Sequence, residues 1–142
     1  MTVRTCAIYL IMTALVFMAA TQLYTFIMQH RDPLSYQKVW TDTPKVPLGG
    51  IFRAHYALTR IRPCRTEVST FMENDETHEI VRRETYVGAA RAAGEYKDIL
   101  LAFKLPPPAD KACYSFSTTA VNYCDEGTHV IPAPYIHFCV VD

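Results

Sequence analysis

Residues 51–60 read Ile-Phe-Arg-Ala-His-Tyr-Ala-Leu-Thr-Arg, and apolar and polar side chains alternate along this stretch. A period of two is typical of a β-strand that has one buried face and one exposed face. We expect Phe52, Ala54, Tyr56 and Leu58 to form the buried row. The residues between them would face water.

Further strand-like segments follow, separated by turn signals at intervals of about ten residues. They cover residues 64–73, 78–87, 96–105, 112–124 and 135–141, with a short additional one at 36–40. Tyr114 precedes an inward Phe116 by two residues, which resembles the tyrosine corner of immunoglobulin-like sandwiches. We therefore expect a mainly β fold: an Ig-like antiparallel β-sandwich of six to seven strands, preceded by one N-terminal transmembrane helix.

The segment from Cys6 to Met28 contains no charged residue and would form a helix of about 34 Å, enough to cross a bilayer core. A cleaved signal peptide is the rival interpretation. If Ala19 or Ala20 ended the peptide, the position three before the cut would hold Phe17 or Met18, and these side chains are too large for the usual small-residue pocket. We expect an uncleaved anchor that contacts the lipid bilayer.

The expected organisation has four parts. These are a short tail at residues 1–5, a transmembrane helix at 6–28, a linker containing proline and glycine at 29–50, and the β-sandwich at 51–142. Proline interrupts regular helix in the linker. Leu105-Pro-Pro-Pro108 would be a rigid crossing between the two sheets.

Four cysteines lie in the expected domain, and an even number favours disulfides in an oxidising compartment. Four reduced thiols in a reducing compartment are the alternative. Asp125-Glu126-Gly127 is interpreted as a three-residue loop, which pairs Cys124 with Thr128 and Cys113 with Cys139. Because Cys64 and Cys124 are both assigned to the inner face, parity favours the bridges Cys64–Cys124 and Cys113–Cys139.

The side of the membrane is indicated by two opposing signals. The count of Lys and Arg near the helix ends slightly favours a cytoplasmic domain, because more of them follow the helix than precede it. The cysteines favour the opposite side. We expect a single-pass membrane protein with its C-terminal domain in the periplasm or outside the cell.

Fourteen basic and fourteen acidic residues give a formal net charge of zero, which disfavours a nucleic-acid partner. Several arginines lie among glutamates on neighbouring strand segments, and we expect them to form cross-strand ion pairs. They are Arg60, Arg62, Arg65, Arg82 and Arg83.

A metal site in the last hairpin is the sharpest chemical alternative, with Cys124, His129, His137 and Cys139 as the candidate ligands. The absence of a Cys-x-x-Cys pair argues against it. Ser115, Ser117, Cys113 and Cys139 are potential nucleophiles, but none lies in a Gly-x-Ser-x-Gly elbow or a cysteine-protease motif. We expect no enzymatic activity, no catalytic residue, no cofactor and no metal.

The layout of the chain resembles small membrane-anchored proteins encoded by tailed phages. The segments that carry the resemblance follow the anchor and are Phe52–Arg60, Cys64–Val68, Leu105–Pro108, Asn122–Cys124 and Pro134–Val141. The resemblance implies a periplasmic Ig-like domain in an infected bacterium and implies no activity.

The function that we expect is that of a membrane-tethered domain that binds another envelope or phage protein, or forms a structural part of an envelope assembly. One alternative is a metal- or small-molecule-binding envelope protein that uses the Cys/His hairpin. A lysis or superinfection-exclusion factor is a further alternative, and it follows from the phage resemblance alone.

Overall fold

The computed structural model describes residues 3–88, 91–106 and 110–142. The chain divides into two units, Met1–Arg31 and Asp32–Asp142. Within these described ranges, the first unit holds one helix and the second holds nine strands. The elements are α1 (Val3–His30), β1 (Leu34–Trp40), β2 (Lys45–Pro47), β3 (Ile51–Arg60), β4 (Arg65–Asn74), β5 (Ile80–Gly88), β6 (Gly94–Lys104), β7 (Cys113–Cys124), β8 (Gly127–Pro132) and β9 (Ile136–Val141).

Helix α1 contains the expected anchor and extends it at both ends. Residues Thr5–His30 are long and apolar enough to span a membrane. The hydroxyl of Thr13 donates to the backbone carbonyls of Tyr9 and Leu10, and the two later threonines do the same one turn back. These bonds satisfy polar groups without water. The expected N-terminal tail is helical from Val3, and residues 1–2 lie outside the described residues.

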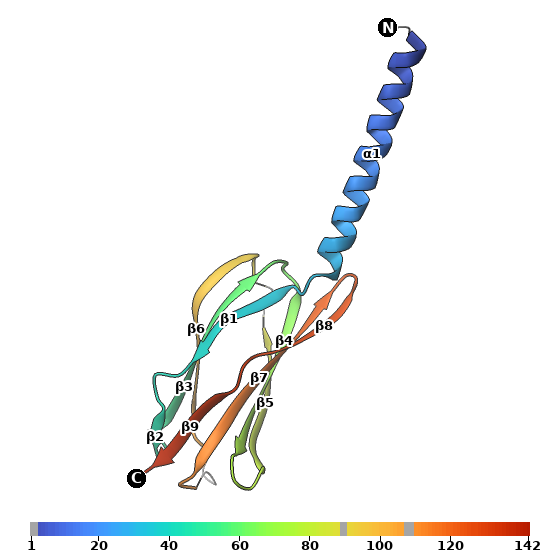
Figure 1. Ribbon diagram of the computed structural model, residues 1–142. Coiled ribbons are helices and arrows are strands. Elements are labelled where there is room, and N and C mark those ends of the chain that lie inside the picture. The colour runs from blue at the N-terminus through green and yellow to red at the C-terminus, as the bar shows by residue number, and fades with distance from the viewer. Residues whose placement is uncertain (1–2, 89–90, 107–109) are drawn as a thin grey trace. The chain divides into compact units, whose positions relative to one another are not determined.

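The nine strands form two facing sheets, so the expected β-sandwich is confirmed (Figure 1). One sheet has the order β1-β3-β6. The other has the order β2-β9-β7-β4-β5, with β8 also paired to β7. Every pair is antiparallel except β2–β9, which is parallel and departs from the expected all-antiparallel arrangement.

The interpretation of residues 29–50 as a linker is wrong for most of that range. Strand β1 pairs with β3, and β2 pairs with β9, so the domain begins at Asp32 instead of residue 51. Prolines at the ends of β2 are tolerated because this strand lies at the edge of its sheet. Strands β2 and β8 lie outside the expected strand segments and bring the number of described strands to nine, above the six or seven expected.

The core lies between the sheets, and the predicted inward row of β3 is buried along its whole length. Phe52 is fully buried, and its ring centroid lies 5.5 Å from that of Phe103, 5.3 Å from that of Phe116 and 4.2 Å from that of Phe138. These four rings come from both sheets. They supply a large share of the apolar area that stabilises the sandwich.

Tyr114 makes the contact expected of a tyrosine corner. Its hydroxyl donates a 2.9 Å hydrogen bond to the backbone carbonyl of Asp110, four residues upstream. Asp110 belongs to the connection from β6 in one sheet to β7 in the other. Residues 107–109 of the predicted proline-rich crossing lie outside the described residues.

The last hairpin differs from its predicted register near the turn. Cys124 pairs with Gly127, so the turn has two residues, Asp125 and Glu126, instead of three. Farther along, two residues of β7 face the three residues 133–135, and this bulge restores the predicted pairs Phe116–Ile136 and Cys113–Cys139. The structure contains the disulfides Cys64–Cys124 and Cys113–Cys139, the same pairs that parity favours.

Candidate functional site

The predicted metal ligands of the C-terminal hairpin divide into two groups. Asn122 of β7 pairs with His129, whereas Ser115 pairs with His137. Seven residues along a strand correspond to about 23 Å, so the four candidates do not meet. The sulfurs of Cys124 and Cys139 are both in disulfides, and neither is a thiolate that could bind zinc.

A smaller group at the turn contains Cys124, Glu126 and His129, whose potential ligand atoms lie within 4.8 Å of one another. Protein partners already engage two of its members. Glu126 forms an ion pair with Arg62 and accepts a hydrogen bond from His129 at 3.2 Å. A bond from its own backbone N–H, and then Arg62, lower the pKa of Glu126. This group is therefore a salt-bridged turn.

The residue types of a catalytic triad lie together at Ser115, His137 and Asp75, but they do not have the geometry of a triad. The hydroxyl of Ser115 donates to Asp75 and also lies 2.9 Å from Nδ1 of His137. Asp75 approaches the same ring nitrogen, at 3.8 Å. A triad requires the carboxylate and the hydroxyl at opposite nitrogens of the imidazole, so this cluster is a set of surface polar contacts.

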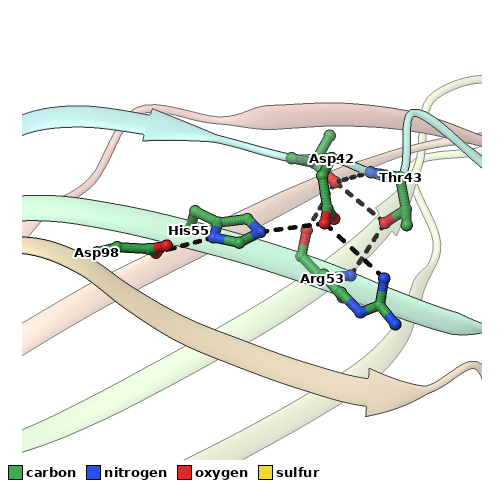
Figure 2. A network of polar contacts seen from close by, with 6 residues as sticks. Asp42, Thr43, Arg53, His55 and Asp98 are labelled. Atoms are coloured by element: carbon green, nitrogen blue, oxygen red, sulfur yellow. Dashed lines mark hydrogen bonds and ion pairs between the residues drawn. The ribbon is translucent and has the colours of Figure 1, made fainter.

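A second polar network surrounds His55 on the outer face of β3 (Figure 2). Nδ1 of His55 lies 2.8 Å from Asp98 of β6, and Nε2 lies 3.5 Å from Asp42. The ring also stacks on Trp40, with centroids 5.1 Å apart. The hydrogen bond to Asp98 raises the pKa of His55, while partial burial opposes the rise.

The same network holds the chain where it leaves β1. The ladder between β1 and β3 stops at the pair Trp40–His55. Beyond it, the hydroxyl of Thr41 donates to the carbonyl of Arg53, and the amide of Arg53 donates to the hydroxyl of Thr43. Side-chain hydroxyls thus replace the next backbone pair, as Figure 2 shows, and the chain can turn toward the other sheet.

A cavity of about 260 Å³ lies between the sheets at the end of the core where β3 finishes. Most of its wall is apolar and comes from strands of both sheets. The apolar lining includes Leu34, Leu58, Val68, Ile99 and Leu101.

Arg60 is the unexpected member of this wall. It continues the inward row of β3 and is 6% exposed. Its Nη1 donates to the carbonyl of Cys64 at 3.3 Å and to the hydroxyl of Thr66 at 3.1 Å. Nε is buried and has no partner among the described residues. Burial lowers the pKa of Arg60.

Two tyrosines lie beside Arg60 in the same wall. The hydroxyl of Tyr56 is 2.6 Å from that of Thr118, whereas Tyr36 makes no hydrogen bond through its hydroxyl to any described residue. Burial raises the pKa of Tyr36 to about 12, although the nearby Arg60 charge opposes this rise. The cavity thus has an apolar wall and unused hydrogen-bond donors at one place.

Sequence reasoning placed Arg60 in a basic stripe with four other arginines and expected ion pairs for all of them. Ion pairs do form at Arg62, Arg65 and Arg82, but those of Arg65 and Arg82 are with Glu67 and Glu84 of the same strand and are not the expected cross-strand pairs. Among the described residues, no carboxylate lies within ion-pair distance of Arg60. Arg60 is separated from Phe52 and Leu58 by an even number of positions, so it lies on the same face of the strand. This spacing was the signal that could have identified an inward arginine.

No protein-family model matches this chain, and no curated protein is similar to it in sequence. Solved structures share the fold. The C-terminal domain of Wzt has a TM-score of 0.58 at 7% identity, with 79% of this chain and 75% of that chain covered. The alkylpurine DNA glycosylase AlkC of Pseudomonas fluorescens has a TM-score of 0.53 at 9% identity and covers 84% of this chain. The match spans 33% of AlkC. At these identities the likeness identifies a β-sandwich and no activity.

Proposed function

We propose that this chain is a single-pass membrane protein whose β-sandwich lies on the periplasmic or extracellular side and binds another envelope protein without catalysis. The observation that carries the proposal is the pair of disulfides, Cys64–Cys124 and Cys113–Cys139, in a domain that follows an anchor-length apolar helix. Disulfides persist in oxidising compartments, so their presence favours the exported side over the Lys and Arg count. The resemblance to tailed-phage proteins suggests the envelope of an infected bacterium.

The lining of the cavity beside Arg60 supports a binding function over an enzymatic one. Among its described lining residues there is no Asp, Glu, His, Ser or Cys. The hydroxyl groups of the described lining belong to tyrosine and threonine, and no carboxylate or imidazole in that lining accompanies them to activate a nucleophile.

Strand β5 supports a protein partner. It is the last strand of its sheet among the described residues, so one side of its backbone has no neighbouring strand. Val87 is 65% exposed, and Ile80 at the other end of the strand is also exposed. An edge strand with exposed apolar side chains accepts an extended segment of a partner by strand addition.

Protease accessibility tests the topology. In spheroplasts of cells that express the full chain, added protease should remove the sandwich and leave the anchor fragment. Protection of the domain until the cells are lysed would reverse the proposed orientation. The thiol state should agree, since blocking of free thiols before lysis should modify Cys6 alone.

Site-specific photo-crosslinking tests the partner. A photoreactive residue at Val87 should form a discrete adduct with one envelope protein in intact cells. The matched control is the same residue at Tyr135, which is equally exposed but lies outside β5. Equal adducts from both positions, or none from Val87, would contradict binding at this edge.

A further inference from the structure

Arg60 is buried without the compensation that buried arginines normally have. Burial of a charge is costly unless hydrogen bonds and an opposite charge offset the lost hydration. Two hydrogen bonds, to Cys64 and Thr66, use one nitrogen of the guanidinium, and Nε remains unpartnered among the described residues. No bond of Nη2 to a described residue exists either. The Nε–Nη2 edge of the guanidinium is therefore unused.

That edge is the one with which arginine binds a carboxylate through two parallel hydrogen bonds. The other charged residue of the cavity wall is Arg91, which is exposed at its rim and has the same sign. The described lining contains no acidic residue. The charge of the cavity therefore favours an anionic group, and the unpaired hydroxyl of Tyr36 offers it a further donor.

The rest of the wall defines the remainder of the ligand. Leu34, Leu58, Val68, Ile99 and Leu101 contribute apolar surface from four strands. A cavity of about 150 Å³ lined by such residues admits benzene, so 260 Å³ corresponds to roughly ten non-hydrogen atoms. A chain of eight carbons that ends in a carboxylate has this size.

We propose that the cavity between the sheets binds a small apolar monocarboxylate, whose carboxylate oxygens accept hydrogen bonds from the Nε–Nη2 edge of Arg60. The apolar part of the ligand lies against the wall formed by β1, β3, β4 and β6. Tyr86 and Gly88 of β5 also line this cavity, whereas Val87 between them is exposed and belongs to the β5 edge. The inference does not depend on the protein partner proposed above.

Thermal unfolding of the full chain in lipid nanodiscs tests the site, with octanoate as the probe and fluorescence of the single Trp40 as the signal. A ligand that binds the folded state raises the midpoint in a concentration-dependent and saturable manner. Octanoate should do so. Octanol has the same chain without the charge and should bind at least tenfold more weakly.

Three variants separate the ligand site from a structural role of Arg60. Arg60→Met should weaken octanoate binding at least tenfold while the midpoint without probe stays equal or rises, because an apolar residue replaces a buried charge. Val68→Phe keeps Arg60 but fills the cavity, and it should also abolish binding. Arg53→Met removes the same charge from the outer face of the same strand and should leave octanoate binding unchanged.

Three results would overturn the inference. Equal binding of octanol and octanoate would remove the role of the charge. Unchanged octanoate binding by Val68→Phe would place the probe elsewhere, which keeps the test decisive if Arg60→Met fails to fold. The third result has two parts: the unfolding midpoint of Arg60→Met without octanoate falls, and Val68→Phe binds octanoate as the wild-type chain does. Arg60 would then have a structural role, as a hydrogen-bond donor to the Cys64 carbonyl.

Discussion

Removal of the Cys64–Cys124 bridge should destabilise the sandwich more than removal of Cys113–Cys139. The first bridge joins residues that are 60 apart in sequence and the second joins residues that are 26 apart. The chain-entropy model gives about 4 kcal/mol for the longer loop and about 3.5 kcal/mol for the shorter one. Both bridges join facing positions of antiparallel strands, since Cys64 and Cys124 continue the register of the pair Arg65–Tyr123. The actual difference should be larger, because residual strand pairing in the unfolded chain forms more readily across the shorter loop and already restricts it.

The measurement is urea unfolding of the full chain in nanodiscs, followed by Trp40 fluorescence. The variants are the double substitutions Cys64→Ala/Cys124→Ala and Cys113→Ala/Cys139→Ala, each compared with the oxidised wild-type chain. At a slope of about 1.5 kcal/mol/M, loss of the first bridge should lower the midpoint by roughly 2.7 M urea. An equal or larger shift for the second double variant would refute the reasoning from loop length and strand pairing.

Three further perturbations test other parts of the structure. Tyr114→Phe removes the hydrogen bond to Asp110 and should lower the free energy of unfolding by about 1 kcal/mol, whereas Tyr135→Phe, on an exposed ring, should have no measurable effect in the same urea titration. Phe52→Ala deletes the ring at the centre of the four-phenylalanine cluster and should cost about 3–5 kcal/mol, with a smaller loss contradicting a tightly packed core. Because Asp98 raises the pKa of folded His55, the charged imidazole stabilises the domain fully below its ordinary pKa of 6.5, and this stabilisation of less than about 1 kcal/mol should disappear as pH rises through the folded pKa. Asp98→Asn should flatten that pH dependence, and a histidine titration by NMR that is the same in both proteins would contradict the assignment.

Alternation was sufficient to predict the inner face of the sandwich. The row from Phe52 to Leu58 is inward. A shift of the strand by one residue would move all of these apolar side chains to the solvent face. The same parity placed Cys64 with Cys124 and Cys113 with Cys139. The inward row required only the period of a strand, whereas the Cys113–Cys139 pair also depended on the bulge at residues 133–135, which offsets the error in the turn.

The features that were missed depend on contacts between distant segments. Strand β2 has three residues between prolines and glycines, and Val46 is buried only because β9 and the core cover it. The hairpin turn was predicted one residue too long. The apolar pairs farther along the hairpin still matched the predicted register, because the bulge at residues 133–135 compensates for the shift. The cavity beside Arg60 depends on the separation of the two sheets, which no local pattern encodes.

The parallel pair β2–β9 has a consequence for the order in which the domain is made. Lys45 pairs with Cys139, so residues 46–138 must all be synthesised between the two partners. During that time β9 is not there to bury Val46, and β2 has no strand to pair with. Contacts of such long range form slowly. The nascent sandwich therefore emerges with one edge open. The Cys113–Cys139 disulfide forms only after β9 has been made, when an oxidant of the compartment accepts the two electrons of the two thiols.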